Sequence, residues 1–144
     1  MIEPKCIALI ACDYAYEDAA CGRYSLLGTM PQIFAERFPH IHPSLYVYFE
    51  LSQGRGQAEV ELALLSPDLL KTVVKTRRRI TFNDPFGLHV GRFQFENLLL
   101  PVDGRYTLRV SVDDKEIGST ILPVHLRESR DGCETEETEN EGDG

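Results

Sequence analysis

The stretch from Leu98–Val112 constrains the fold of this chain more than any other part of it. Pro101, Asp103 and Gly104 predict a turn, and the residues that follow alternate between apolar and polar side chains, which is the period of a half-buried strand. Tyr106 stands two residues after Gly104. This spacing is typical of the tyrosine corner of Greek-key sandwiches, in which the phenol hydroxyl bonds to backbone upstream. The segment therefore predicts a β-sandwich.

The same two-residue period continues along most of the chain. It predicts strands over residues 5–13, 23–30, 44–52, 57–66, 72–83, 89–97, 106–112 and 116–126. Between them we expect a loop over residues 14–22 and a proline-rich crossover between sheets over residues 31–43. Turn residues recur about every 8–12 positions. The predicted fold is all-β, a seven- to eight-stranded antiparallel Greek-key sandwich of the immunoglobulin-like type.

The negative charge of the chain is concentrated at its C-terminal end. The net charge is −8, and residues 131–144 hold seven acids without a Lys or Arg, so the other 130 residues carry only 16 acids against 15 bases. We therefore predict one sandwich domain over residues 1–126 and an acidic, disordered tail over residues 127–144. The tail either solubilises the protein or binds a basic partner. A body without excess positive charge argues against nucleic acid as a partner.

The sequence predicts a cytoplasmic protein. No segment approaches the roughly 20 consecutive apolar residues that cross a bilayer, and Glu3 stands where a signal peptide carries positive charge. In the cytoplasm the four cysteines, Cys6, Cys12, Cys21 and Cys133, are expected to stay reduced. We expect no membrane association.

Several short motifs follow one another in a recognisable order. They are Cys12-Asp13, Gly22-Arg-Tyr-Ser-Leu-Leu-Gly28, Pro43–Leu51, Gly104-Arg-Tyr106, Ile117-Gly-Ser119 and Leu122-Pro-Val124. This order resembles a family of small, uncharacterised bacterial β-sandwich proteins, a domain of unknown function, over residues 5–126. Arg23 stands where that family usually has a lysine. The resemblance implies a sandwich fold and a bacterial cytoplasmic setting, and it brings no activity or catalytic residue.

His40 and His42 are the candidate metal ligands. At strand spacing the two imidazoles face the same side, and Cys12 or Asp13 would complete a zinc-type site. The pair lies between prolines in the predicted crossover, where solvent-facing or capping histidines are also expected. We therefore assign no metal and no cofactor, and keep His40 and His42 as weak candidates.

Arg77-Arg-Arg79 is the main basic run. On a strand, Arg77 and Arg79 point to the same side, where two guanidinium groups can bind a phosphate or a carboxylate. They can equally pair with Glu59 and Glu61 across strands, protect an edge strand, or hold the acidic tail of the same chain. These alternatives stay open at the level of sequence.

Four tyrosines are the candidate binding residues besides Arg77 and Arg79. Tyr46 and Tyr48 fall on the strand face opposite the core, and Tyr14 and Tyr16 fall in the predicted loop. Tyrosine is enriched at interfaces because it offers contact area at low entropic cost. The alternative is that the predicted crossover covers Tyr46 and Tyr48.

No nucleophile, phosphate loop or cofactor motif stands out in the chain. The expected function is therefore a non-enzymatic protein-interaction module that binds a protein partner or associates with itself. The alternative is a small metal- or ligand-dependent enzyme that uses His40 and His42. A small-ligand carrier is a third hypothesis, and it requires a deep apolar pocket.

Overall fold

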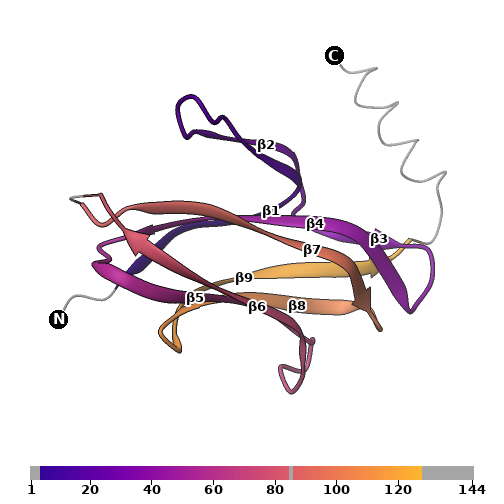
Figure 1. Ribbon diagram of the computed structural model, residues 1–144. Helices are drawn as coiled ribbons and strands as arrows, with labels where there is room; N and C mark the ends of the chain where they lie inside the picture. The colour runs from indigo at the N-terminus through magenta and orange to yellow at the C-terminus, as the bar shows by residue number, and fades with distance from the viewer. Residues whose placement is uncertain (1–3, 85, 128–144) are drawn as a thin grey trace, which may run out of the picture.

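The protein consists of two β-sheets that pack face to face (Figure 1). The computed structural model describes residues 4–84 and 86–127, and within these ranges the chain forms strands and turns without a helix. The four-stranded sheet has the order β2-β1-β4-β7, with β2 Tyr24–Thr29, β1 Lys5–Glu17, β4 His40–Ser52 and β7 His89–Leu100. The five-stranded sheet has the order β3-β9-β8-β5-β6, with β3 Ile33–Ala35, β9 Lys115–Leu126, β8 Gly104–Val112, β5 Gly56–Leu65 and β6 Thr72–Phe82. The all-β prediction is confirmed.

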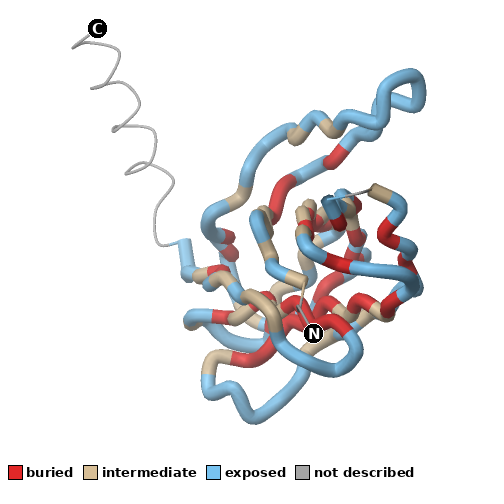
Figure 2. Tube along the Cα trace, turned by 90° about the vertical axis from the view of Figure 1, so that its left-hand side faces the viewer, coloured by how far each residue is buried: buried red, intermediate tan, exposed pale blue. Residues whose placement is uncertain are grey.

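The core lies between the two sheets, as the alternating pattern predicts. On β4, every second side chain is fully buried, at Leu45, Val47, Phe49 and Leu51. β5 and β8 supply the facing layer, with Val60, Leu62, Leu64, Leu108 and Val110 fully buried. Figure 2 shows buried positions concentrated within the body of the molecule, whereas turns are exposed. Burial of one apolar face on each sheet is the main source of stability in such a fold.

Tyr106 forms the corner contact that its spacing predicts. The side chain is fully buried, and its hydroxyl donates a 2.6 Å hydrogen bond to the carbonyl oxygen of Val102. The Val102 N–H donates to the same hydroxyl oxygen over 3.3 Å. The predicted bond to backbone upstream is confirmed. It ties the turn before β8 to the core edge of the five-stranded sheet.

The first correction concerns residues 14–22, which do not form one long loop. β1 continues to Glu17, and Tyr14, Ala15, Tyr16 and Glu17 pair with β2. The turn is tighter than predicted: the Asp18 N–H donates to the Arg23 carbonyl over 2.8 Å. The prediction failed because alanines alternate here with polar residues, and small side chains give little hydrophobic signal.

The second correction concerns residues 31–43, which contain strand structure. β3 crosses to the five-stranded sheet and pairs with β9 in parallel, and β4 begins at His40. The described residues therefore form nine strands, with one parallel pair, instead of seven or eight antiparallel strands. β3 has only three residues, which is too short for a periodic pattern. Pro43 lies within β4, so this proline does not mark a strand boundary as predicted.

One of the two sheets is curled as a half-barrel. The hairpin of β1 and β2 rises from the four-stranded sheet (Figure 1) and bends over its outer face, where it contacts side chains of β4 and β7. The described residues include no helix with the length and apolar character needed to cross a membrane. The predicted acidic tail, from residue 128 onward, lies outside the described residues.

Candidate interaction surface

The outer face of the four-stranded sheet brings together tyrosines from two strands. Cys12 lies opposite Tyr46 in the β1–β4 ladder, so Tyr14 is placed on the same side as Tyr46. The two tyrosine rings meet edge to face, with centroids 4.9 Å apart and an angle of 69° between their planes. This geometry is the favoured one for aromatic pairs. The contact therefore holds both rings in defined positions.

Arg92, on β7, completes this aromatic pair. Its guanidinium carbon lies 5.5 Å from the ring centroid of Tyr46 and 5.9 Å from that of Tyr14, within the range of cation–π attraction. Nη1 of Arg92 also donates a hydrogen bond to the backbone carbonyl of Ala15. Since β4 separates β7 from β1 in the sheet, this bond spans an intervening strand. Arg92 thus fixes the curled hairpin over the sheet.

A second tyrosine pair continues the same surface. Tyr24, at the start of β2, lies with its ring centroid 5.4 Å from that of Tyr48. The hydroxyl of Tyr48 donates a hydrogen bond to Glu50 Oε2. Burial, followed by the hydrogen bond to Glu50, raises the pKa of Tyr48. Tyr48 therefore stays a neutral hydrogen-bond donor at physiological pH.

The tyrosines differ in exposure in a way that suits an interaction surface. Tyr14 and Tyr16 are 39% and 49% exposed, whereas Tyr46 and Tyr48 are half-buried. We define the tyrosine face as the side chains of Tyr14, Tyr16, Tyr24, Tyr46, Tyr48 and Arg92. The β1–β2 hairpin, and not the predicted crossover, is what packs on Tyr46 and Tyr48. The face is thus an ordered aromatic layer with an accessible rim.

Sequence reasoning missed Tyr24 and Arg92. Both lay on predicted strands, and the inward positions of Phe93 and Phe95 already implied that Arg92 points outward. Nothing in the sequence indicated that Tyr24 and Arg92 contact the other tyrosines, because these contacts form only when the β1–β2 hairpin bends over β4 and β7. Alternation assigns a side to each residue and gives no information on what lies across the sheet.

The candidate metal ligands His40 and His42 lie side by side on β4, with ring centroids 5.8 Å apart. Nε2 of His40 is buried and has no hydrogen-bond partner among the described residues. Burial, then the neighbouring His40, lowers the pKa of His42, although Asp13 opposes the shift. Across the described ranges, no three His, Cys, Asp or Glu side chains gather in a metal-binding group. The pair can supply at most two ligands from these residues.

Arg77 and Arg79 lie on the outer face of the five-stranded sheet, whereas the candidate tyrosines lie on strands of the four-stranded sheet. Arg77 forms ion pairs with Glu59, Glu61 and Asp114 at 2.8, 2.8 and 3.3 Å. These pairs raise the pKa of Arg77, with the Glu59 hydrogen bond as the largest cause. Of the alternatives weighed for Arg77, the cross-strand pairing with Glu59 and Glu61 is the one observed. Arg79 is paired with Glu59 in the backbone ladder.

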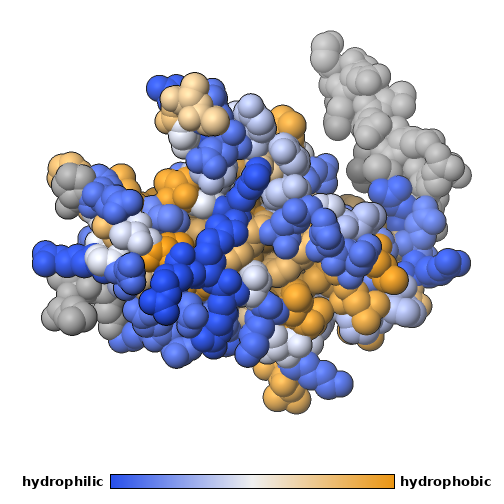
Figure 3. All heavy atoms as spheres, in the orientation of Figure 1, coloured by the Kyte–Doolittle hydropathy of each residue, from blue (hydrophilic) through white to orange (hydrophobic). Residues whose placement is uncertain are grey.

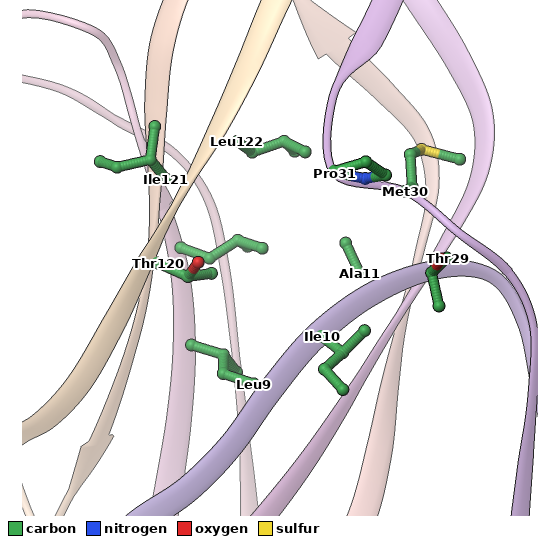
Figure 4. A pocket seen from close by; sticks show the side chains of 10 residues that line it. Leu9, Ile10, Ala11, Thr29, Met30, Pro31, Thr120, Ile121 and Leu122 are labelled. Atoms are coloured by element: carbon green, nitrogen blue, oxygen red, sulfur yellow. The ribbon is translucent and has the colours of Figure 1, made fainter.

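An apolar pocket of about 190 Å³ lies where β1 and β9 run side by side without hydrogen bonding (Figure 4). β1 contributes Leu9, Ile10 and Ala11, and the facing side chains come from Thr120, Ile121, Leu122 and the Thr29–Pro31 segment. Pockets that enclose a small-molecule ligand measure about 300–1,000 Å³. This pocket can therefore take a single apolar side chain more readily than a whole ligand.

Comparison with known proteins identifies a family, but the function of that family is unknown. A family model described as a family of unknown function (DUF6941) matches residues 7–125. The resemblance predicted over residues 5–126 to an uncharacterised family is thereby confirmed. No curated protein matches the chain.

Proposed function

Because the chain belongs to a family of unknown function (DUF6941), membership brings no activity with it, and we propose that the protein is a non-enzymatic binding module that uses the tyrosine face. The observation that carries the proposal is the position of Arg92 against Tyr14 and Tyr46. The stack is ordered before any partner arrives, so binding does not have to immobilise these side chains.

The composition of the tyrosine face supports a protein partner. Tyrosine and arginine are the residues that most often carry binding energy at protein interfaces. Tyr14 and Tyr16 keep 39% and 49% of their surface accessible, which leaves aromatic edges and hydroxyl groups for a partner. A second copy of the chain is an alternative occupant. Sedimentation of the purified protein over a range of concentrations distinguishes a dimer from a complex with another protein.

A paired pull-down tests the proposal. The full chain, Tyr16→Ser and Leu70→Ser are compared as baits in lysate of the native source, with quantitative mass spectrometry. Leu70 is 83% exposed on the β5–β6 connection, so Leu70→Ser is a matched loss of one exposed side chain elsewhere. The proposal requires a partner that Tyr16→Ser loses and Leu70→Ser retains. A partner retained equally by both variants would place the binding site elsewhere.

A second candidate function is the small metal- or ligand-dependent enzyme centred on His40 and His42. The buried Nε2 of His40, without a hydrogen-bond partner among the described residues, is the observation that favours it. Metal analysis of protein purified without a histidine tag tests this candidate. Stoichiometric metal that is lost in His40→Ala supports it, whereas metal-free protein with the same thermal stability before and after added zinc removes it.

Three expectations from the sequence remain proposals. They are a bacterial origin, a cytoplasmic location, and the assignment of the two-sheet fold to the Greek-key, immunoglobulin-like class. The tyrosine corner of Tyr106 supports the last of these. Superposition of an experimental structure on immunoglobulin-like domains tests it.

A further inference from the structure

The outer face of the five-stranded sheet carries a group of cations. Val60, Leu62 and Leu64 point into the core, so Glu61 and Ala63 between them on β5, and their cross-strand neighbours, point outward. Ala63 pairs with Lys75 of β6 and with Arg109 of β8. Arg79 and Arg105 share this side by register. We define the basic face as the four side chains of Lys75, Arg79, Arg105 and Arg109.

Three carboxylates on this side of the sheet are already engaged in ion pairs. Glu59, Glu61 and Asp114 all pair with Arg77. Among the residues that the structure describes, none of the four cations of the basic face has a carboxylate within 4.0 Å. Figure 3 shows hydrophilic side chains gathered where β6 crosses the front of the molecule. The basic face therefore offers positive charge to an acidic ligand.

The C-terminal segment starts beside this face. β9 ends at Leu126 in the same sheet, and its residue Pro123 pairs with Arg105. Arg109 lies four residues further along β8, and Lys75 lies two strands across from it. Residues 131–144 carry seven acids without a base. An extended chain spans about 3.3 Å per residue and strands are about 4.8 Å apart, so the segment is long enough to reach all four cations.

We propose that residues 131–144 dock in cis on the basic face of the five-stranded sheet, through ion pairs with Lys75, Arg79, Arg105 and Arg109. The attachment at the end of β9 gives the segment an effective concentration in the millimolar range, as for other short tethers. Weak individual ion pairs at an exposed face then suffice for an interaction of several contacts. This proposal is independent of the tyrosine face, which lies on the other sheet.

The charge on the outer face of the four-stranded sheet also favours the basic face as the docking site for residues 131–144. The outer side of the four-stranded sheet carries Glu50 and Glu96, which pair in register with Ala8 and Ser44, and two cations, Arg92 and Lys5, of which Lys5 pairs with Ser52. That side therefore has no excess of positive charge to attract the acidic segment, whereas the basic face has four cations without an ion pair among the described residues. The two sheets therefore differ in charge in the direction that the proposal needs.

Zero-length carbodiimide cross-linking of the full chain tests the proposal, because it joins a carboxylate to a lysine amine only in direct contact. The expected product, identified by peptide mass spectrometry, joins Lys75 to an acid within residues 131–144. Lys5, exposed on β1 of the other sheet, is the matched control and is expected to give little product. The product should fall by about threefold or more between 0.1 M and 1 M salt, since the screening length shrinks from about 10 Å to about 3 Å.

Two variants and one mixing experiment complete the design. In the full chain, the double change Arg105→Ser with Arg109→Ser and the triple change Glu134→Gln, Glu136→Gln and Glu137→Gln should each lower the Lys75 product by a similar factor. The triple change lies outside the described strands, so it tests the contact even if the double variant unfolds. An equal mixture of isotope-labelled and unlabelled chains should give products within one chain. Absence of the Lys75 product, equal products at Lys5 and Lys75, or mixed-label products alone would overturn the proposal.

Discussion

The guanidinium of Arg92, on β7, donates a hydrogen bond to the backbone carbonyl of Ala15, on β1. The two residues are 77 positions apart in the sequence, and β4 lies between their strands in the sheet. The bond therefore links β7 to β1 across the outer side of β4. The same guanidinium lies against Tyr14 and Tyr46, so one side chain both bends the hairpin and orders the tyrosine face.

Replacement of Arg92 should loosen the hairpin. Arg92→Met keeps the length of the side chain and removes the hydrogen bond and both cation–π contacts. Because a charged donor is lost from a half-buried carbonyl, the free energy of unfolding should fall by about 1–3 kcal/mol. Amide hydrogen exchange in β2 should accelerate more than exchange in β5. Arg55→Met, on an exposed turn, is the control and should change neither quantity; equal effects of the two variants would contradict the role of Arg92.

The Tyr106 hydroxyl should contribute measurably to stability. Tyr106→Phe removes the partner of both the N–H and the carbonyl of Val102, while the ring stays in the core. We expect a loss of about 1–3 kcal/mol in the free energy of unfolding, measured from urea midpoints at constant slope. Tyr16→Phe, on an exposed ring, should leave the midpoint unchanged. A midpoint equal to wild type for Tyr106→Phe would show that the corner is dispensable.

Stability should decrease when the pH falls from neutral toward about pH 5.5. Burial lowers the pKa of His42 and of His89 below the usual value of 6.5, and Arg78 adds to the effect at His89. The unfolded chain then binds more protons than the folded protein below about pH 6.5, so protonation favours unfolding. The contribution of the two neutral histidines to the free energy of unfolding is fully present above their pKa in the unfolded chain. It is lost as the pH falls toward their lower pKa in the folded protein.

Urea midpoints at about pH 7.5 and about pH 5.5 measure this dependence in a range where most carboxylates stay ionised. The double variant His42→Gln with His89→Gln should show a smaller difference between the two midpoints than wild type. If the difference stays the same in the double variant, other groups cause the pH dependence and the account of these two histidines is wrong.

Arg77 and Arg79 should behave differently although they share a strand face. Arg77→Gln breaks three ion pairs at an exposed site, so the melting temperature should fall slightly at low salt and recover toward wild type at 1 M salt, where screening has already weakened the pairs. Arg79→Gln, which breaks no ion pair among the described residues, should lower the melting temperature less than Arg77→Gln does at low salt. A salt-independent loss for Arg77→Gln would mean that its aliphatic stem, and not its charge, stabilises the sheet.

Local patterns predicted the parts of the fold that depend on neighbours in sequence. The alternation through Leu45 and Leu51 predicted both the strand and its buried side. The spacing of Gly104 and Tyr106 predicted a bond from the Tyr106 hydroxyl to backbone upstream, which the structure shows at Val102, because that contact closes within four residues. The Arg77 pairing with Glu59 and Glu61 was among the alternatives, since adjacent strands with opposite charges favour it.

The features that sequence could not predict depend on curvature and on long-range pairing. Tyr14 and Tyr16 were placed in a loop, because Ala15 gives no apolar signal although its side chain is fully buried. β3 is too short for a pattern, and its parallel partner lies about ninety residues away, at Val124 for Ile33. In the sequence, Arg92 is one of several polar residues at outward strand positions. Its contact with Ala15 depends on how the β1–β2 hairpin folds over the sheet.

Site-specific photo-cross-linking at Tyr16 shows directly whether the tyrosine face contacts a partner. A photoreactive phenylalanine analogue replaces Tyr16 in the full chain in cells of the native source, and the matched control carries it at Leu70. Leu70 is more exposed than Tyr16, 83% against 49%, so the control position samples chance encounters at least as fully. We expect a discrete protein adduct at position 16 that is absent at position 70 and disappears when Arg92→Met disorders the face. The same adducts at both positions, or none at position 16, would contradict a binding role for the tyrosine face.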